Sequence, residues 1–191
     1  MKLYQMTVLI VSISASALCQ NLPIDSLPPI QDQDEYEVAT VVLRELTRNE
    51  IERSELDCIE LHRKALPGNW ETKSLMRYYV DVVDSARTDL LVQDFATKSN
   101  DSVSYRWEAR FPIGIPYRWK DYGHPATERC TVEFEISRVG FDTEHFFALV
   151  SVLRMHTYDD RIVSGEHRFI HLERVAGQWE FRKNTVTLVI N

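Results

Sequence analysis

Apolar positions follow a helical period in the first half of the chain. Tyr36, Ala39, Leu43 and Leu46 recur at helical spacing within residues 34–50, and Asp34 is a candidate cap. A second helical pattern begins near Val80 and ends at the polar residues 98–101. These spacings predict two helices, and Pro67 and Gly68 interrupt regular structure between them.

Apolar and polar residues alternate with a period of two in the second half, which is typical of half-buried strands. We predict strands over residues 56–62, 103–109, 130–137, 145–155, 167–175 and 179–190, and an irregular, proline-rich segment over 112–125. Short turn signals at 140–144, 159–165 and 176–178 link the last four strands. Such short links favour an antiparallel meander.

Helices followed by strands predict an α+β fold. We expect the N-terminal helices to pack on one face of a curved, mainly antiparallel C-terminal sheet, with a cone-like sheet as one candidate shape. The length of 191 residues fits a single folded domain, which we place at residues 35–191.

Residues 1–19 have the order of a secretory signal peptide: a lysine, a short apolar stretch and then small residues. The apolar stretch is too short to cross a bilayer as a helix, so we expect no transmembrane span after cleavage. Residues 20–34 predict an extended linker. The protein is therefore expected to be exported to the periplasm, the cell envelope or the medium, and Cys19 leaves a lipid-anchored form as the alternative.

The net charge of −7 argues against a nucleic-acid partner, because binding to phosphate backbones depends on clustered cations. The sequence also contains no phosphate-binding loop and no dinucleotide fingerprint, so we expect no cofactor. The expected partner is a ligand or protein of the envelope that the sequence does not identify. The oligomeric state is left open as well.

Cys58 and Cys130 are the cysteines that remain after the leader. In an oxidising compartment they are a candidate disulfide, and two buried thiols are the alternative. Their spacing does not match a zinc site.

One predicted hairpin brings together imidazole and carboxylate groups. His156, Asp159, Asp160 and His167 flank its turn, and such a set could hold a divalent metal ion or provide acid–base chemistry. The alternative is a polar hairpin tip whose charges face solvent.

An aromatic and cationic strip is the most unusual local composition of the chain. We predict a binding surface from five of its members: Tyr105, Trp107, Arg118, Trp119 and Tyr122. If exposed, these side chains could bind a sugar, a peptide or an anionic polymer through ring faces and guanidinium donors. If buried, they form a core strand and a closing loop.

The last third of the chain resembles a group of exported bacterial proteins whose activity is uncharacterised. The resemblance rests on the segments 136–142 (ISRVGFD), 148–152 (ALVSV), 172–174 (LER) and 177–181 (GQWEF). It implies an envelope location and supplies no catalytic residues. Within these segments we interpret Gly140 as a residue with positive φ at a strand end, and Phe141 and Trp179 as core anchors.

Taken together, these features favour a non-catalytic exported domain that binds a ligand or a protein. A small metal-dependent hydrolase that uses the His156 and His167 hairpin is the first alternative. A purely structural envelope protein is the second. The sequence leaves enzymatic activity uncertain, and we favour a protein that is not an enzyme.

Overall fold

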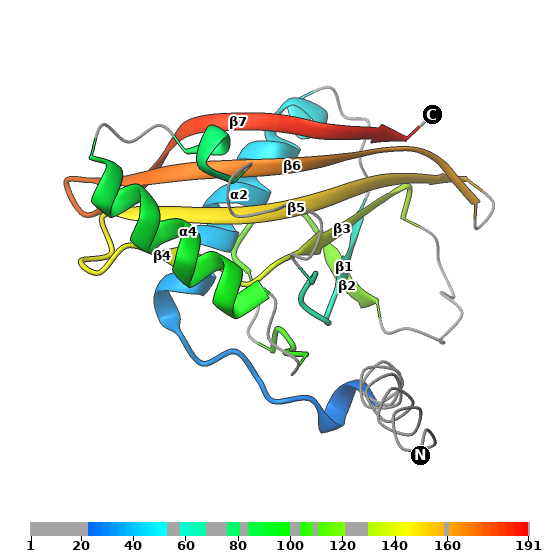
Figure 1. Ribbon diagram of the computed structural model, residues 1–191. Coiled ribbons are helices and arrows are strands. Elements are labelled where there is room, and N and C mark those ends of the chain that lie inside the picture. Colours follow the sequence, from blue (N-terminus) through cyan, green and yellow to red (C-terminus); the bar gives the residue numbers. More distant parts are fainter. Residues whose placement is uncertain are drawn as a thin grey trace, which may run out of the picture.

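The computed structural model describes residues 23–52, 58–67, 76–80, 84–99, 104–108, 111–120, 130–158 and 161–190. These residues form two α-helices, two short 3₁₀-helices and a seven-stranded sheet (Figure 1). The helices are α2 (Gln33–Glu52) and α4 (Ser85–Ser99), and the 3₁₀-helices are η2 (Ile24–Ser26) and η3 (Arg77–Tyr79). The strands are β1 (Ile59–His62), β2 (Tyr117–Lys120), β3 (Val132–Ile136), β4 (Gly140–Phe141), β5 (Phe147–Tyr158), β6 (Arg161–Val175) and β7 (Gln178–Ile190). The α+β class is confirmed.

The sheet is mainly antiparallel, as predicted. Its strand order is β2-β1-β3-β5-β6-β7, and β4 pairs with β5 beside this path. β3, β5, β6 and β7 pair antiparallel, whereas β1 pairs parallel with both β2 and β3. The β6–β7 turn is held by Ala176 and Gly177, both with positive φ, which matches the twist of a tight hairpin.

The two helices cover opposite faces of the sheet, with α4 in front of the strands and α2 behind them in Figure 1. Val150 of β5 belongs to the core under α2, whereas the adjacent Leu149 belongs to the core with α4. The expectation that the helices share one face is therefore wrong. All five side chains of residues 148–152 are fully buried, as in strands that are covered on both faces.

Gly140 has a different role from the one we predicted. Among the described glycines, Gly114 and Gly177 have positive φ values but Gly140 does not. A Cβ atom on Gly140 would lie 2.4 Å from Cβ of Phe95 and 2.5 Å from its Cα atom. Glycine is thus required because α4 packs directly against the backbone of β4.

A buried ion pair joins α2 to the segment before β4. Glu35 is fully buried and accepts hydrogen bonds from the guanidinium of Arg138 at 2.7 Å and from the backbone N–H of Val139 at 3.0 Å. Lys98 of α4 lies 3.8 Å from the same carboxylate. One carboxylate therefore links both helices to one end of the sheet.

Three local predictions need correction. The predicted linker is packed where it is described, because Leu27 and Ile30 are buried and the backbone of 28–30 bonds to that of Arg106. Residues 104–108 form no regular strand: Arg106 makes isolated bridges to Pro29 on one side and to Lys64 on the other, and the prolines at 28 and 29 have no N–H to donate to a ladder. The segment 112–125, expected to be irregular, contains β2, while β6 begins within the predicted 159–165 turn.

None of the helices in the described ranges is long and apolar enough to span a membrane. Residues 1–22 lie outside the described residues, so the signal-peptide and lipid-anchor interpretations remain predictions.

Candidate functional site

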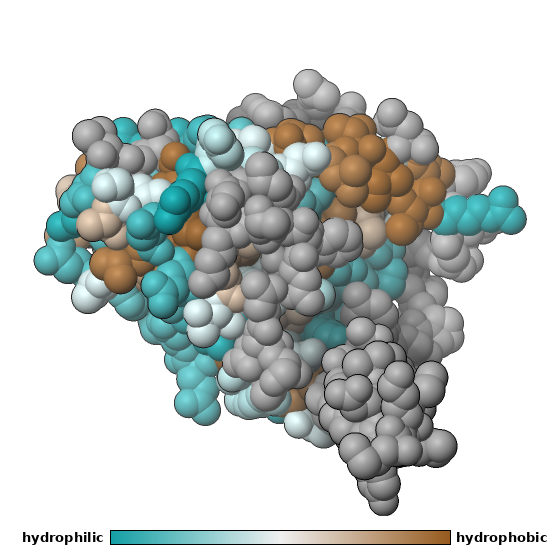
Figure 2. All heavy atoms as spheres, viewed as in Figure 1, coloured by the Kyte–Doolittle hydropathy of each residue, from teal (hydrophilic) through white to brown (hydrophobic). Residues whose placement is uncertain are grey.

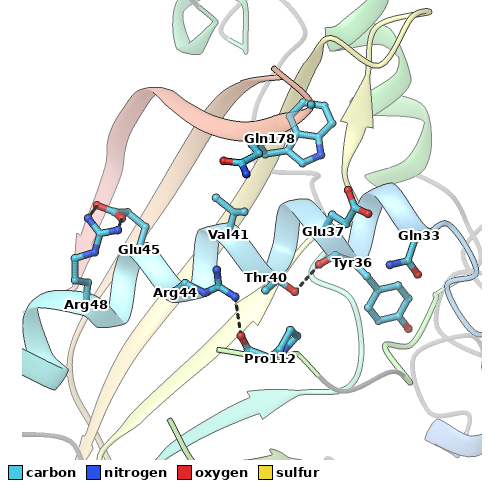
Figure 3. Close-up of a pocket in the computed structure, with 12 residues that line it drawn as sticks. Gln33, Tyr36, Glu37, Thr40, Val41, Arg44, Glu45, Arg48, Pro112 and Gln178 are labelled. Carbon is cyan, nitrogen blue, oxygen red and sulfur yellow. Dashed lines mark hydrogen bonds and ion pairs between the residues drawn. The ribbon is translucent and has the colours of Figure 1, made fainter. Parts of the chain in front are cut away.

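A cavity of about 710 Å³ lies between α2 and the start of β7. Figure 3 shows Gln178 facing Val41 across it, with Arg44 reaching towards Pro112. The residues that line it are Gln33, Tyr36, Glu37, Thr40, Val41, Arg44, Glu45, Arg48, Pro112, Gly177, Gln178 and Trp179. We call this cavity the α2–β7 groove.

Helical periodicity explains why α2 forms one wall of the groove. Positions 37, 41, 44 and 48 follow one another at three or four residues, and position 45 lies four residues after 41 and three before 48, so all five lie on one side of the helix. A neighbouring face carries Val38, Val42 and Leu43, which are fully buried in the core against the sheet. The same helix thus packs on the sheet and presents a polar stripe to the groove.

Trp179 forms part of the opposite wall. Its side chain packs on Phe141 at a centroid distance of 5.8 Å, and the guanidinium carbon of Arg174 lies 5.4 Å from its ring centroid. The residue is only 6% exposed, and its Nε1–H has no hydrogen-bond partner among the described residues. The indole N–H can only donate, and leaving a buried donor unsatisfied costs about 1–3 kcal/mol.

The charges of the groove leave one cation without an acidic partner. Arg48 pairs with Glu45 at 2.9 Å, and Arg174 beside the groove lies 3.6 Å from Glu37. Arg44 donates to the backbone oxygen of Pro112 at 2.8 Å, and none of the described carboxylates forms an ion pair with it. The lining therefore has two carboxylates and two guanidiniums, and Arg44 is the guanidinium that forms no ion pair with the described carboxylates.

The predicted aromatic strip is mostly core. Trp107 is 1% exposed, and Tyr117 and Trp119 pack against the same core from β2. Arg118 is exposed and lies on the other face of β2, because successive side chains alternate. Tyr105 is half-buried beneath the guanidinium of Arg138. Tyr122 lies outside the described residues, and the other four do not form one exposed surface.

The predicted metal hairpin is not assembled either. His156 pairs with Ser164 across the hairpin, whereas His167 pairs with Leu153, and the two imidazoles therefore lie on opposite faces of the sheet. Asp159 and Asp160 lie outside the described residues. No group of three His, Cys, Asp or Glu side chains that could hold a metal ion occurs within the described ranges.

Each of these histidines has a depressed pKa. Burial and then the charge of Arg154 lower the pKa of His156. Burial also lowers the pKa of His167, whose Nε2 and Nδ1 atoms contact the hydroxyls of Ser151 and Thr187 at 2.6 and 2.7 Å. His167 is 4% exposed, so this serine–histidine contact is a buried structural link between strands.

A buried polar cluster on β1, β2 and β3 is absent from the predicted sites. His62 Nε2 lies 3.1 Å from Glu133 Oε2, while Lys120 Nζ lies 2.5 Å from Glu133 Oε1 and 3.4 Å from Glu60. Burial by itself raises the pKa of Glu133, but hydrogen bonds from His62 and Lys120 outweigh burial and hold this pKa below its ordinary value. In the sequence, the only sign of this cluster is the alternation of Glu133 and Glu135 in β3. An alternating pattern by itself predicts that such glutamates face solvent.

Cys58 and Cys130 are joined by a disulfide in the structure, with their Cα atoms 5.3 Å apart. The bond joins the residue before β1 to the segment that leads into β3, two strands that pair in parallel. Of the two alternatives, a disulfide or two buried thiols, the structure contains the disulfide.

Comparisons with models of known protein families, with curated proteins and with solved structures found no match to this chain. The resemblance to exported bacterial proteins therefore remains a prediction from the sequence.

Proposed function

We propose that this protein is a non-catalytic binding domain whose ligand occupies the α2–β7 groove. The observation that carries the proposal is the indole N–H of Trp179, a buried donor without a partner at the wall of the groove. Because the Nε1 atom is itself buried, a bound acceptor would satisfy this donor once the indole turns towards the groove. The gain is larger than at an exposed site, because the atom is shielded from water and hydrogen bonds are stronger in a less polar environment.

The groove also specifies the chemistry of the ligand. Arg44 adds a guanidinium without an acidic partner, and a guanidinium binds carboxylates through paired hydrogen bonds. Val41, Pro112 and the buried ring of Trp179 offer apolar contacts between the polar groups. The ligand that fits best is an organic acid with an apolar body, and the same chemistry occurs at the C-terminus of a peptide.

The proposal includes an exported location. Its support is the leader pattern at residues 1–19 together with the disulfide between Cys58 and Cys130, because disulfides persist in oxidising compartments. We also propose that the sheet curves in a cone-like way. Register shifts in the β5–β6 and β6–β7 pairs support this shape, because bulges bend strands and increase twist.

Indole N–H resonances test the groove directly. The ¹⁵N-labelled protein is titrated with N-acetylphenylalanine and, separately, with its uncharged amide. The Trp179 signal is assigned by its loss in Trp179→Phe. We expect a saturable shift of that signal with the acid and weaker binding of the amide. The Trp107 signal should not move, because its N–H already donates to the oxygen of Ile136 at 3.3 Å.

A matched pair of variants tests the charge. Arg44→Gln should weaken binding of the acid about tenfold, the value of one charge-assisted hydrogen bond. Arg48→Gln should have a smaller effect, because Arg48 is paired with Glu45. Binding of acid and amide with equal affinity would refute the role of Arg44. No shift of the Trp179 signal with either probe would favour a purely structural protein.

A further inference from the structure

Exposed apolar side chains gather at one end of the sheet, away from the groove. Nine large apolar side chains of the described residues are exposed, and five of them lie at the start of β6 and the end of β7: Ile162, Val163, Val186, Leu188 and Val189. Figure 2 shows the apolar patch they contribute to, over the C-terminal end of β7. Patches of this kind mark interaction surfaces.

This part of β7 is also an unprotected edge. β7 is the last strand in the sheet order, so one side of its backbone has no neighbouring strand among the described residues. Its segment Asn184–Ile190 contains no charged residue, no proline and no glycine. Proteins normally protect an exposed edge strand with charges, prolines or a covering element. The first half of β7 carries Glu180, Arg182 and Lys183, so the protection is absent only from the second half.

The exposed side chains lie on both faces of the sheet. Val186 is paired with Arg168 and Val189 with Glu166, whereas Leu188 is paired with His167 on the other face. A helix or a domain packed on one face would leave the other face exposed. A strand that pairs with the edge contacts both, because its own side chains alternate between the faces.

We propose that this edge binds a second copy of the chain, with the two Asn184–Ile190 segments paired antiparallel about a twofold axis. A twofold interface places the same surface on both partners. The segment suits this arrangement because it is uncharged, so that self-pairing places no like charges opposite each other. A second copy also supplies apolar side chains on both faces in the places where the first copy exposes them.

The proposal is independent of the groove. Gln178 and Trp179 line the groove at the first residues of β7, and Gly177 lines it from the preceding turn, whereas the paired segment lies at the last residues of the strand. Dimerisation would therefore leave the groove open in each copy.

Sedimentation of the purified protein over a range of concentrations tests the proposal. We expect a dimer that dissociates on dilution, and at least tenfold weaker association in Val186→Lys/Val189→Lys. The matched control is Leu90→Lys, because Leu90 of α4 is also exposed, at 46%, but lies away from the edge. Leu90→Lys should associate like the wild type. A wild type that is monomeric throughout would overturn the proposal.

Hydrogen exchange of the wild type provides a second test that needs no variant. Backbone amides of residues 184–190 should exchange more slowly at high than at low protein concentration, because the second copy accepts hydrogen bonds from the edge. Amides of α4 should be unaffected by concentration. A dimer whose β7 amides exchange at the same rate at all concentrations would place the interface elsewhere and refute the proposal.

Discussion

Replacing Gly140 with alanine should destabilise the domain through a single methyl group. The new Cβ would lie 2.4 Å from Cβ and 2.5 Å from both Cα and N of Phe95, well inside normal contact distance. Two of these atoms belong to the backbone of α4, so no rotamer change relieves the clash and the helix itself must move. Overpacking costs about 1–3 kcal/mol, and we expect about 3 kcal/mol here.

Thermal unfolding followed by circular dichroism measures this effect. A loss of about 3 kcal/mol corresponds to a decrease in Tm of roughly 6–12 °C for a domain of this size. Gly177→Ala is the matched control: its Cβ meets no atom within 4 Å, and its cost comes from the positive φ of +83° alone. That cost is about 1–2 kcal/mol. If Gly140→Ala unfolds within about 2 °C of the wild type, the contact between α4 and β4 is looser than the structure shows.

Three further predictions concern buried polar groups and the disulfide. Glu35→Gln should lower the free energy of unfolding in urea by about 3–5 kcal/mol, because it leaves Arg138 without its buried partner; a loss below about 1 kcal/mol would contradict this. Cys58→Ser/Cys130→Ser should lower it by about 4 kcal/mol, since the bond closes a loop of 72 residues, whereas unchanged stability would show that the loop is already ordered when unfolded. The free energy of unfolding should fall as the pH decreases below about 6.5, because burial lowers the pKa of His167 and the unfolded chain then binds more protons than the native protein. His167→Gln should flatten this pH dependence, and the remaining slope should come in part from His156.

Local patterns in the sequence predicted the elements whose formation depends on near neighbours. The helical spacing over residues 34–50 matches α2 (Gln33–Glu52), and the last four alternating runs match β3, β5, β6 and β7. The antiparallel order of these strands also followed, because short turns allow no other connection. Helix and strand periods are properties of consecutive residues, so they are visible without the fold.

The register between paired strands, and the face of the sheet on which each side chain lies, depend on contacts that the sequence does not display. His156 and His167 were expected to meet across a turn at 159–165, but β6 begins at Arg161 and the pairing places them on opposite faces. A small change in loop length is enough for this, because side chains alternate with every residue. The same alternation explains why Trp119 of the predicted aromatic strip packs against the core whereas its neighbour Arg118 is exposed.

The candidate site itself was determined partly by sequence and mainly by tertiary structure. Trp179 was expected to be a core anchor, and it is, with Phe141 as its neighbour. The sequence does not show that the indole N–H of Trp179 lacks a hydrogen-bond partner or that Trp179 lines the same groove as Arg44. Both features depend on how α2 packs behind the sheet. Sequence by itself determined the two long helices and the four long runs that become β3, β5, β6 and β7, because their periods are local; it did not determine β2 or the irregular course of residues 104–108. Tertiary structure decided which side chains share a cavity, since that depends on the packing of segments far apart in the chain.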